Sequence, residues 1–199
     1  MSGVATTGNA IQTTVGAQPT YVASTPAFNG YPTVNVDGDD NIKFDFLSTE
    51  SASLFAVAEG TFVSGGENQL IQVRGDGGIV LYRALNKMIR GRYWSQSTTN
   101  SSGAIGSLLD DGVPFIASYI LQQGGTSSLY NMRNLSGTAS TESHAAESSN
   151  SSIGGENSDV QYWNGGIGEL IHYDGVVSGT ERMIIGNYLS AKYFFLLET

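Results

Sequence analysis

The chain has 199 residues, of which 40% are hydrophobic and only 14% charged. Its 9 Lys and Arg against 18 Asp and Glu give a net charge of −9, which disfavours long-range attraction to nucleic acid or to anionic lipid. The absence of cysteine excludes a disulfide framework and a thiolate metal site. These features predict a soluble domain whose surface consists mainly of uncharged polar residues.

The first residues of the chain, 1–25, are small and polar and are interrupted by Gly and Pro, so we expect an extended N-terminal arm. They lack the basic start and continuous apolar core of a signal peptide. No apolar run in the sequence approaches the ~20 residues that a membrane span needs. We expect one domain over residues 26–199, with neither a signal peptide nor a membrane span.

Short segments rich in β-branched and aromatic residues follow, separated by turns of Gly, Asn, Asp and Ser. The first two lie on either side of the acidic turn 37–41. The other expected strands are 53–58, 69–74, 79–85, 88–95, 114–121, 128–134 and 167–173. This number of short strands predicts a β-sandwich or a jelly roll, with the polar tract 136–159 as a long exposed loop.

The end of the sequence has the pattern of a helix. Ser178 and Glu181 have the spacing of a capping box, in which a hydroxyl and a carboxylate accept hydrogen bonds from each other's backbone N–H groups. Apolar residues then recur at helical spacing: Ile184, Ile185, Tyr188 and Leu189. We expect a helix over about 179–193 whose apolar stripe covers an edge or a face of the sandwich.

The same region carries a family resemblance. The strand GGIGELIHYD, a turn, and the helix SGTERMIIGNYLSAKY resemble the C-terminal signature of concanavalin A-like, laminin G-like jelly-roll domains. The residues of this structural signature include Glu169, Ser178, Glu181, Arg182, Tyr188 and Lys192. The stretches at 18–22, 29–44 and 53–59 are similar to upstream strands of the family. The resemblance implies an all-β fold, a two-sheet antiparallel jelly roll with one C-terminal α-helix.

Two positions depart from the family pattern. The residue before Ile167, often acidic in the family, is Gly166, and the Trp-containing segment that opens many family members is missing. The missing segment suggests a trimmed or rebuilt first strand, in whose place we expect the N-terminal arm.

Domains of this family occur as glycan-binding or spacer modules of secreted enzymes and adhesins, and in bacteriophage structural proteins. Because the domain fills this chain, the resemblance implies a non-catalytic virion structural or decoration protein on a bacteriophage capsid or tail. Its expected partners are other virion proteins, further copies of itself as a homo-oligomer, and a host glycan. The alternative is a carbohydrate-binding adhesion module of a cell-surface or secreted protein.

The sequence lacks the paired carboxylates of an enzyme on this fold. Laminarinase-like glycoside hydrolases need the pattern E-x-D-x-x-E on one strand, so that two carboxylates flank the scissile bond. Glu59 and Glu169 stand alone, and we predict no catalytic residue. Glu169 is expected to be structural, accepting backbone hydrogen bonds or pairing with Arg182 on the helix.

An oxygen-rich turn contains Asp37, Asp39 and Asp40, which could hold calcium. The EF-hand pattern fails there, because Ile42 stands where Gly is needed and Ser48 where Glu is needed. We favour a solvated turn whose side chains cap backbone groups, and we expect no cofactor.

Two aromatic pairs have the flat faces that stack on sugar rings. They are Tyr93 with Trp94 and Tyr162 with Trp163. We favour the interpretation that one residue of each pair lies in the core and the other at its rim. Four cations concentrate on neighbouring strands and predict a contact patch for an acidic protein or another copy of the chain. They are Arg83, Lys87, Arg90 and Arg92.

Overall fold

The computed structural model describes residues 10–44, 51–62, 66–73, 78–94, 103–140, 151–155 and 161–193. The strands in these ranges are β1 (Thr20–Val22), β2 (Thr33–Asp37), β3 (Ile42–Phe44), β4 (Ala52–Ala58), β5 (Asn68–Val73), β6 (Gly78–Arg83), β7 (Met88–Trp94), β8 (Gly103–Leu108), β9 (Phe115–Leu121), β10 (Thr126–Asn131), β11 (Asn134–Ser140), β12 (Ser151–Ile153) and β13 (Asn164–Asp174). The helices are the short 3-10 turns η1 (Val15–Ala17) and η2 (Pro26–Phe28) and the α-helix α1 (Gly179–Tyr193).

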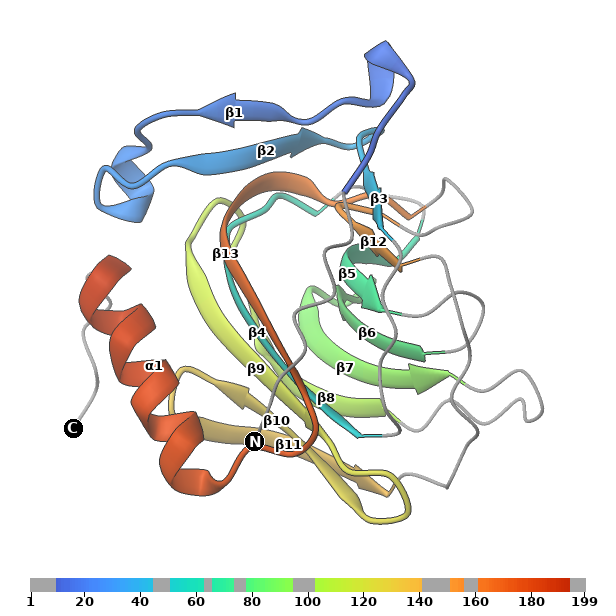
Figure 1. Cartoon of the computed structure of the whole chain (residues 1–199), viewed down its shortest axis with the longest axis vertical. Coiled ribbons are helices and arrows are strands. Elements are labelled where there is room, and N and C mark those ends of the chain that lie inside the picture. The colour runs from blue at the N-terminus through green and yellow to red at the C-terminus, as the bar shows by residue number, and fades with distance from the viewer. Residues whose placement is uncertain are drawn as a thin grey trace.

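Two antiparallel sheets pack face to face, with α1 on the far side of the larger one (Figure 1). The seven-stranded sheet has the order β1-β2-β13-β4-β9-β10-β11, and the six-stranded sheet has the order β3-β12-β5-β6-β7-β8. Strand β13 lies between β2 and β4, so segments far apart in the sequence are neighbours, as in a jelly roll. The predicted fold, a concanavalin A-like two-sheet jelly roll with one C-terminal helix, is confirmed.

The main core lies between the two sheets. Alternate residues of β4, including Leu54 and Ala56, point into it and meet Leu81 and Ile89 of the six-stranded sheet. Gly91 of β7 allows the sheets to approach, because a Cβ there would lie 2.3 Å from the ring of Tyr119 on β9. The side-chain alternation of the strands therefore fills the space between the two sheets with apolar groups.

A second apolar cluster lies between α1 and the outer face of the seven-stranded sheet. Phe55 and Val57 of β4 point towards it and meet Leu189 and Tyr193 of the helix. Because both faces of β4 are covered, all seven of its residues are buried. This explains why the strand reads as a continuous apolar run, ASLFAVA, and does not alternate.

The predicted apolar stripe of α1 is partly wrong. Leu189 is 1% exposed, but Ile184 is 62% and Tyr188 48% exposed. The helix is turned so that Tyr193 contacts the ring of Phe28 edge to face, at 6.0 Å between centroids. The face of the helix that packs on the sheet is thus formed by residues spaced one turn apart, including Ile185, Leu189 and Tyr193.

The start of α1 has the predicted capping box. The backbone N–H of Ser178 donates to Oε2 of Glu181 at 2.8 Å, and the N–H of Glu181 donates to Oγ of Ser178 at 3.2 Å. The first of these bonds lowers the pKa of the Glu181 carboxyl. The helix begins at Gly179 and ends at Tyr193, as its sequence pattern indicates.

The described part of the N-terminal arm joins the seven-stranded sheet. Strand β1 pairs with β2 of that sheet, and the arm also contacts the six-stranded sheet, where the N–H of Ile11 donates to the carbonyl oxygen of Lys43 in β3 at 2.7 Å. The segment that we expected to be an arm over residues 1–25 therefore supplies an edge strand, in agreement with a rebuilt first strand. Residues 1–9 lie outside the described part of the chain.

Two strands occur where the sequence shows no alternation of apolar residues. Strand β8 has the sequence GAIGSL and β11 the sequence NLSGTAS. Strands β11 and β12 both overlap the tract 136–159, so the prediction of one continuous loop is wrong there. Residues 141–150 and 156–159 of that tract lie outside the described residues. Strand β11 pairs with β10 and strand β12 with β5, and this backbone pairing stabilises both polar strands with little apolar burial.

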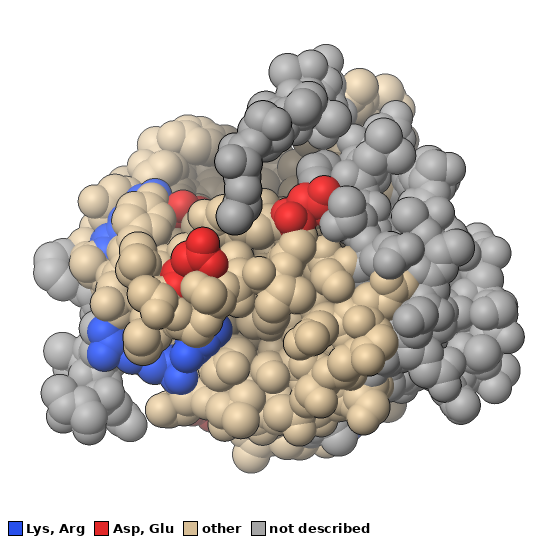
Figure 2. All heavy atoms as spheres, turned by 60° about the horizontal axis from the view of Figure 1, so that its bottom comes forward, with Lys and Arg blue, Asp and Glu red and all other residues tan. Residues whose placement is uncertain are grey.

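The surface reflects the low content of charged residues. Figure 2 shows one face, on which uncharged residues cover most of the described area and the basic and acidic residues form only small patches. Among the described residues no helix is both long and apolar enough to cross a membrane.

Candidate functional site

The four predicted contact-patch cations do not share one surface. Arg83 is 1% exposed, so its assignment to a contact patch is wrong. Its guanidinium donates from Nη1 to the carbonyl oxygen of Gly60 at 2.9 Å and from Nη2 to the carbonyl oxygen of Leu109, and it pairs with Asp111 at 2.9 Å. Arg83 points into the sandwich because it alternates along β6 with Tyr82, which lies on the opposite face. Its role is structural.

Lys87 lies in the turn between β6 and β7 and also binds Asp111. The distance from its Nζ to Oδ2 of Asp111 is 2.5 Å. This hydrogen bond is the main cause of a low pKa for Asp111, about 2, and the N–H of Phe62 and the Arg83 guanidinium lower it further. Lys87 and Arg83 together hold the loop that contains Asp111, so Lys87 is also occupied within the molecule.

Arg90 and Arg92 lie on the face of β7 that points away from the main core. In the register of the sheet Arg90 is opposite Tyr82 and Arg92 opposite Val80. Two nitrogens of Arg92 bind the carboxylate of Glu67, at 2.5 and 3.3 Å, and its Cζ lies 4.5 Å from the centre of the Tyr82 ring. A two-pronged charged hydrogen bond and a stacked ring fix the orientation of these side chains.

The hydroxyl of Tyr82 stays protonated at neutral pH. Burial raises its pKa, and this effect outweighs the lowering by the charge of Arg92 and by a hydrogen bond from Arg90. Because the phenol of Tyr82 is neutral, it does not offset the positive charges of Arg90 and Arg92 on this face.

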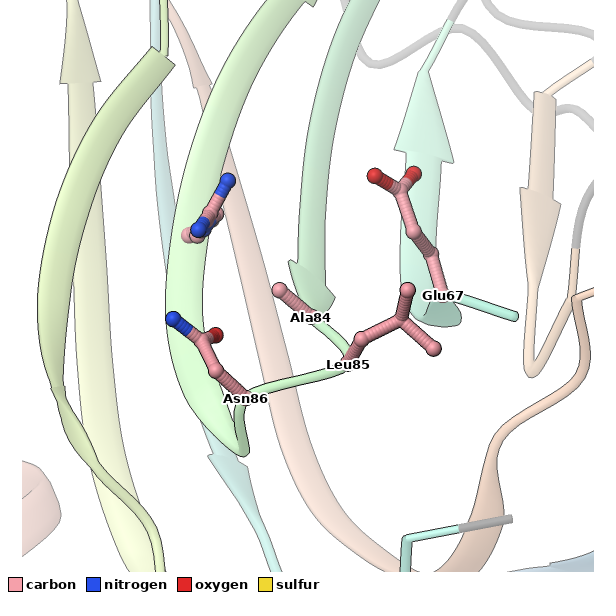
Figure 3. A pocket seen from close by; sticks show the side chains of 5 residues that line it. Glu67, Ala84, Leu85 and Asn86 are labelled. Carbon is pink, nitrogen blue, oxygen red and sulfur yellow. The ribbon is translucent and has the colours of Figure 1, made fainter. Parts of the chain in front are cut away.

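A pocket of about 280 Å³ opens beside these residues (Figure 3). It is lined by Glu67, Ala84, Leu85, Asn86 and Arg90. Figure 3 shows Glu67 at the start of β5 and Ala84, Leu85 and Asn86 in the turn between β6 and β7. Leu85 is 66% exposed, and the Nε of Arg90 is buried without a hydrogen-bond partner among the described residues. The pocket therefore combines an apolar rim with an amide, a carboxylate and a guanidinium.

The turn between β6 and β7 places the rim residues. The N–H of Ala84 donates to the carbonyl oxygen of Met88 at 2.9 Å, and the N–H of Lys87 donates to that of Ala84 at 2.8 Å. Lys87 takes the left-handed conformation, with φ of 62°, which closes a three-residue hairpin loop. Leu85 and Asn86 consequently stand at the tip of a rigid turn.

The sequence pattern did not reveal three parts of this pocket. Glu67, Leu85 and Asn86 have no distinctive motif, whereas Arg90 was already in the predicted patch. The one available signal is the alternation Arg90-Gly-Arg92, which puts two cations on the same strand face and calls for a carboxylate on a neighbouring strand. Glu67 is that carboxylate for Arg92.

The structure describes the side chains of only one of the two predicted aromatic pairs, Tyr162 and Trp163. Trp163 is 1% exposed, and its Nε1 donates to the carbonyl oxygen of Glu59 at 3.0 Å, so the prediction that it stacks on a sugar is wrong. Tyr162 is half-buried, so this pair agrees with the favoured interpretation of one core residue and one rim residue. The backbones of Tyr93 and Trp94 form the end of β7, and their side chains lie outside the described part of the structure.

Glu169 has the expected structural role with a different partner. Its Oε2 lies 2.9 Å from Nζ of Lys192 and accepts a hydrogen bond from the hydroxyl of Tyr193 at 3.3 Å. The predicted pairing with Arg182 is wrong, because the Cζ of Arg182 lies 3.8 Å from the centre of the Tyr130 ring. Glu169 therefore joins β13 to the last turn of α1, where Lys192 stands.

The carboxylates of Asp37, Asp39 and Asp40 lie within 4.8 Å of one another. A hydrogen bond and the charge of Asp37 raise the pKa of Asp39, and burial is the main cause of a raised pKa for Asp40. Oδ2 of Asp40 accepts a hydrogen bond from the N–H of Asp37 at 3.3 Å, a contact of the kind expected in a solvated turn. The expectation of a solvated turn without a bound cation stays a prediction.

The fold defines a class, the concanavalin A-like jelly roll. No family model and no curated protein sequence matches the chain. Solved structures do match: the binding domain of botulinum neurotoxin serotype G is 13% identical, with a TM-score of 0.68 over 93% of this chain and 47% of that chain. Domain 4 of AbnA, an extracellular GH43 arabinanase from Geobacillus stearothermophilus solved with arabinotriose, is 12% identical, with a TM-score of 0.65 over 90% of this chain and 87% of that chain.

A further similar structure is the CBM40 of the Ruminococcus gnavus IT-sialidase bound to α2,3-sialyllactose. It is 13% identical, with a TM-score of 0.60 over 77% of this chain and 96% of that chain. At these identities the likeness shows the shared fold.

Proposed function

We propose that this protein is a non-catalytic glycan-binding module that binds its ligand at the pocket beside the β6–β7 turn. The observation that carries the proposal is the chemistry of that pocket, lined by Leu85, Asn86, Glu67, Arg90 and Ala84. The apolar rim suits the C–H face of a sugar ring, and the amide, carboxylate and guanidinium suit its polar substituents. A pocket with one apolar side and several polar groups is the expected form of a site for a small saccharide.

The rigidity of the site supports the proposal. Glu67 is held by Arg92, and Leu85 and Asn86 stand on a hydrogen-bonded turn. Because these side chains are already ordered in the free protein, binding loses little side-chain entropy, and a small contact area can give measurable affinity. The similar structures were solved with arabinotriose and with sialyllactose, which favours a saccharide as the ligand class.

The proposal is of binding without catalysis. Glu169, the acidic strand residue of the signature, binds Lys192 and Tyr193. The sequence contains no E-x-D-x-x-E pattern that would place a second carboxylate beside it. We propose glycans of a cell surface or of the extracellular space as the targets.

The role on a bacteriophage particle, with capsid or tail proteins as partners, stays a prediction from the family context. A glycan-binding site is compatible with it, because virion surface proteins contact host glycans. Neighbouring genes for capsid or tail proteins would support that setting.

A glycan array tests the proposed function. Wild-type protein is expected to bind a subset of glycans, and Leu85→Ala is expected to weaken that binding about fivefold, because about 1 kcal/mol of apolar contact is lost. Leu135→Ala is the matched control, since Leu135 is 58% exposed on β11 and does not line the pocket. The proposal fails if the wild-type protein binds no glycan more tightly than millimolar, or if both variants bind equally.

A further inference from the structure

We propose that the pocket selects saccharides that carry a carboxylate, and that Arg90 is the residue that recognises it. The inference rests on the proposed glycan-binding function and specifies its ligand class. It follows from the distribution of charges around the pocket, which differs from that of the molecule as a whole.

The first step is the pairing of the charges. The carboxylate of Glu67 is bound through both oxygens by Arg92. Arg90 lines the pocket and forms no ion pair with another residue of the described part of the chain. Glu67, Arg90 and Arg92 together carry a local charge of +1, on a molecule whose net charge is −9.

The second step is the hydrogen-bonding capacity of Arg90. Its Nε is buried and has no acceptor among the described residues. Because that nitrogen is shielded, an anion arriving in the pocket would be bound by the terminal nitrogens of the guanidinium, for which no carboxylate of the described residues competes. The planar fork of a guanidinium matches the two oxygens of a carboxylate, which makes a carboxylate the best-fitting anion.

The third step excludes polyanions. A molecule with charge −9 repels heavily sulfated polymers and nucleic acids at long range, and a local charge of +1 neutralises one anionic group. The ligand is therefore an acidic sugar with a single carboxylate at the pocket, such as a uronic or a sialic acid residue. Asn86 and the outer lone pairs of Glu67 then bind hydroxyl groups, and Leu85 contacts the ring.

The test compares each acidic saccharide with its neutral counterpart by calorimetry on the full chain. The pairs are trigalacturonate with its carboxyl-reduced form, and sialyllactose with lactose. At neutral pH at least one acidic member is expected to bind about tenfold more tightly than its neutral partner, the effect of a charge-assisted fork. For trigalacturonate the preference should weaken as the pH falls below about 4, because its carboxylates, which are ordinary carboxylic acids, become protonated there.

Variants of Arg90 assign the preference to this residue. Arg90→Gln is expected to abolish the preference and to keep the affinity for the neutral sugar, and Arg90→Lys to keep part of the preference. Arg133→Gln is the matched control, because Arg133 is exposed and binds Asn187 on α1. Circular dichroism at the binding temperature checks that each variant is folded, and the pH dependence of wild-type binding serves if Arg90→Gln is unfolded.

The outcomes separate the two proposals. If neutral sugars bind as tightly as acidic ones, or if Arg90→Gln retains the preference, the inference about Arg90 is overturned and the glycan-binding function stands. If no glycan binds at all, on the array or in calorimetry, both proposals fail together.

Discussion

One buried charged residue, Arg83, connects several parts of the structure inside the sandwich. Arg83 is a fully buried cation that binds the carbonyl oxygens of Gly60 and Leu109 and the carboxylate of Asp111. Arg83 occupies a core-facing position at one end of β6. Its contacts connect the loop that contains Gly60 and the loop that contains Leu109 and Asp111 to that end of the sheet. A buried guanidinium is costly unless acceptors and a counter-charge surround it, so the contacts to Gly60, Leu109 and Asp111 constrain both loops.

Asp111 makes stability depend on pH. Its pKa in the folded protein, about 2, lies below its ordinary value of 3.8, so its contribution is present above about pH 4 and is lost as the pH falls towards 2. We expect the free energy of unfolding of Asp111→Asn, measured with urea, to vary less between pH 4 and pH 2 than that of the wild type. Asp110→Asn, at the exposed neighbouring position, is the control and should follow the wild type. Equal pH dependence in all three proteins would contradict the assignment.

The acidic turn is expected to cost stability at neutral pH. The pKa of Asp39 is raised by Asp37, so its charged form is disfavoured in the folded protein, and the loss of stability appears as the pH rises through that pKa. Asp39→Asn should therefore melt at a higher temperature than the wild type at pH 7 and at the same temperature in strong acid. Millimolar calcium should leave the wild-type melting temperature unchanged. A rise with calcium that Asp39→Asn abolishes would instead establish a calcium site.

At the scale of elements, the sequence predicts strands well where apolar residues mark them and poorly where they do not. Strands β4 and β9 are apolar on both faces and stand out, whereas β8 and β11 consist mostly of Gly, Ser, Ala and Thr. Their positions are decided by pairing with neighbouring strands, which no local pattern encodes. The helix and its capping box are local signals and were predictable to the residue.

The candidate site shows the same limit. The cations of β6 and β7 were visible in the sequence, but both faces of β6 are apolar, with Leu81 on one and Val80 on the other. The pattern therefore gave no means of deciding that Arg83 points into the core and Arg90 away from it. Glu67 and Leu85 reach the pocket through strand register and a turn, and both of these are tertiary properties.

The orientation of α1 gives a test with two matched substitutions. Leu189→Ala is expected to lower the free energy of unfolding by about 2–5 kcal/mol, because it opens a cavity between the helix and the sheet. Ile184→Ala, on the exposed face, is expected to change it by less than about 0.5 kcal/mol. Urea unfolding of both variants measures the difference. Equal losses would mean that the helix presents the stripe predicted from its sequence.

At the scale of the whole molecule, the two sheets have different tasks. The seven-stranded sheet is covered on one face by the six-stranded sheet and on the other by α1, so it serves as the scaffold. The six-stranded sheet carries Arg90, Arg92 and Tyr82 on the face away from the main core, with the pocket at the end of its β6–β7 hairpin. This division places the candidate binding chemistry opposite the helix and on strands whose other face is locked into the core.

The position of β13 between β2 and β4 has a consequence for synthesis on the ribosome. The β1–β2 hairpin is made first, yet its neighbour in the sheet, Asn164–Asp174, is made more than a hundred residues later. Until that strand emerges, β2 has an open edge and the outer face of β4 has no helix to cover it. Such long-range pairing slows folding and leaves strand edges available to other nascent chains. The seven-stranded sheet is thus expected to form only after β13 has left the ribosome, and the chain is expected to benefit from chaperones that shield those edges.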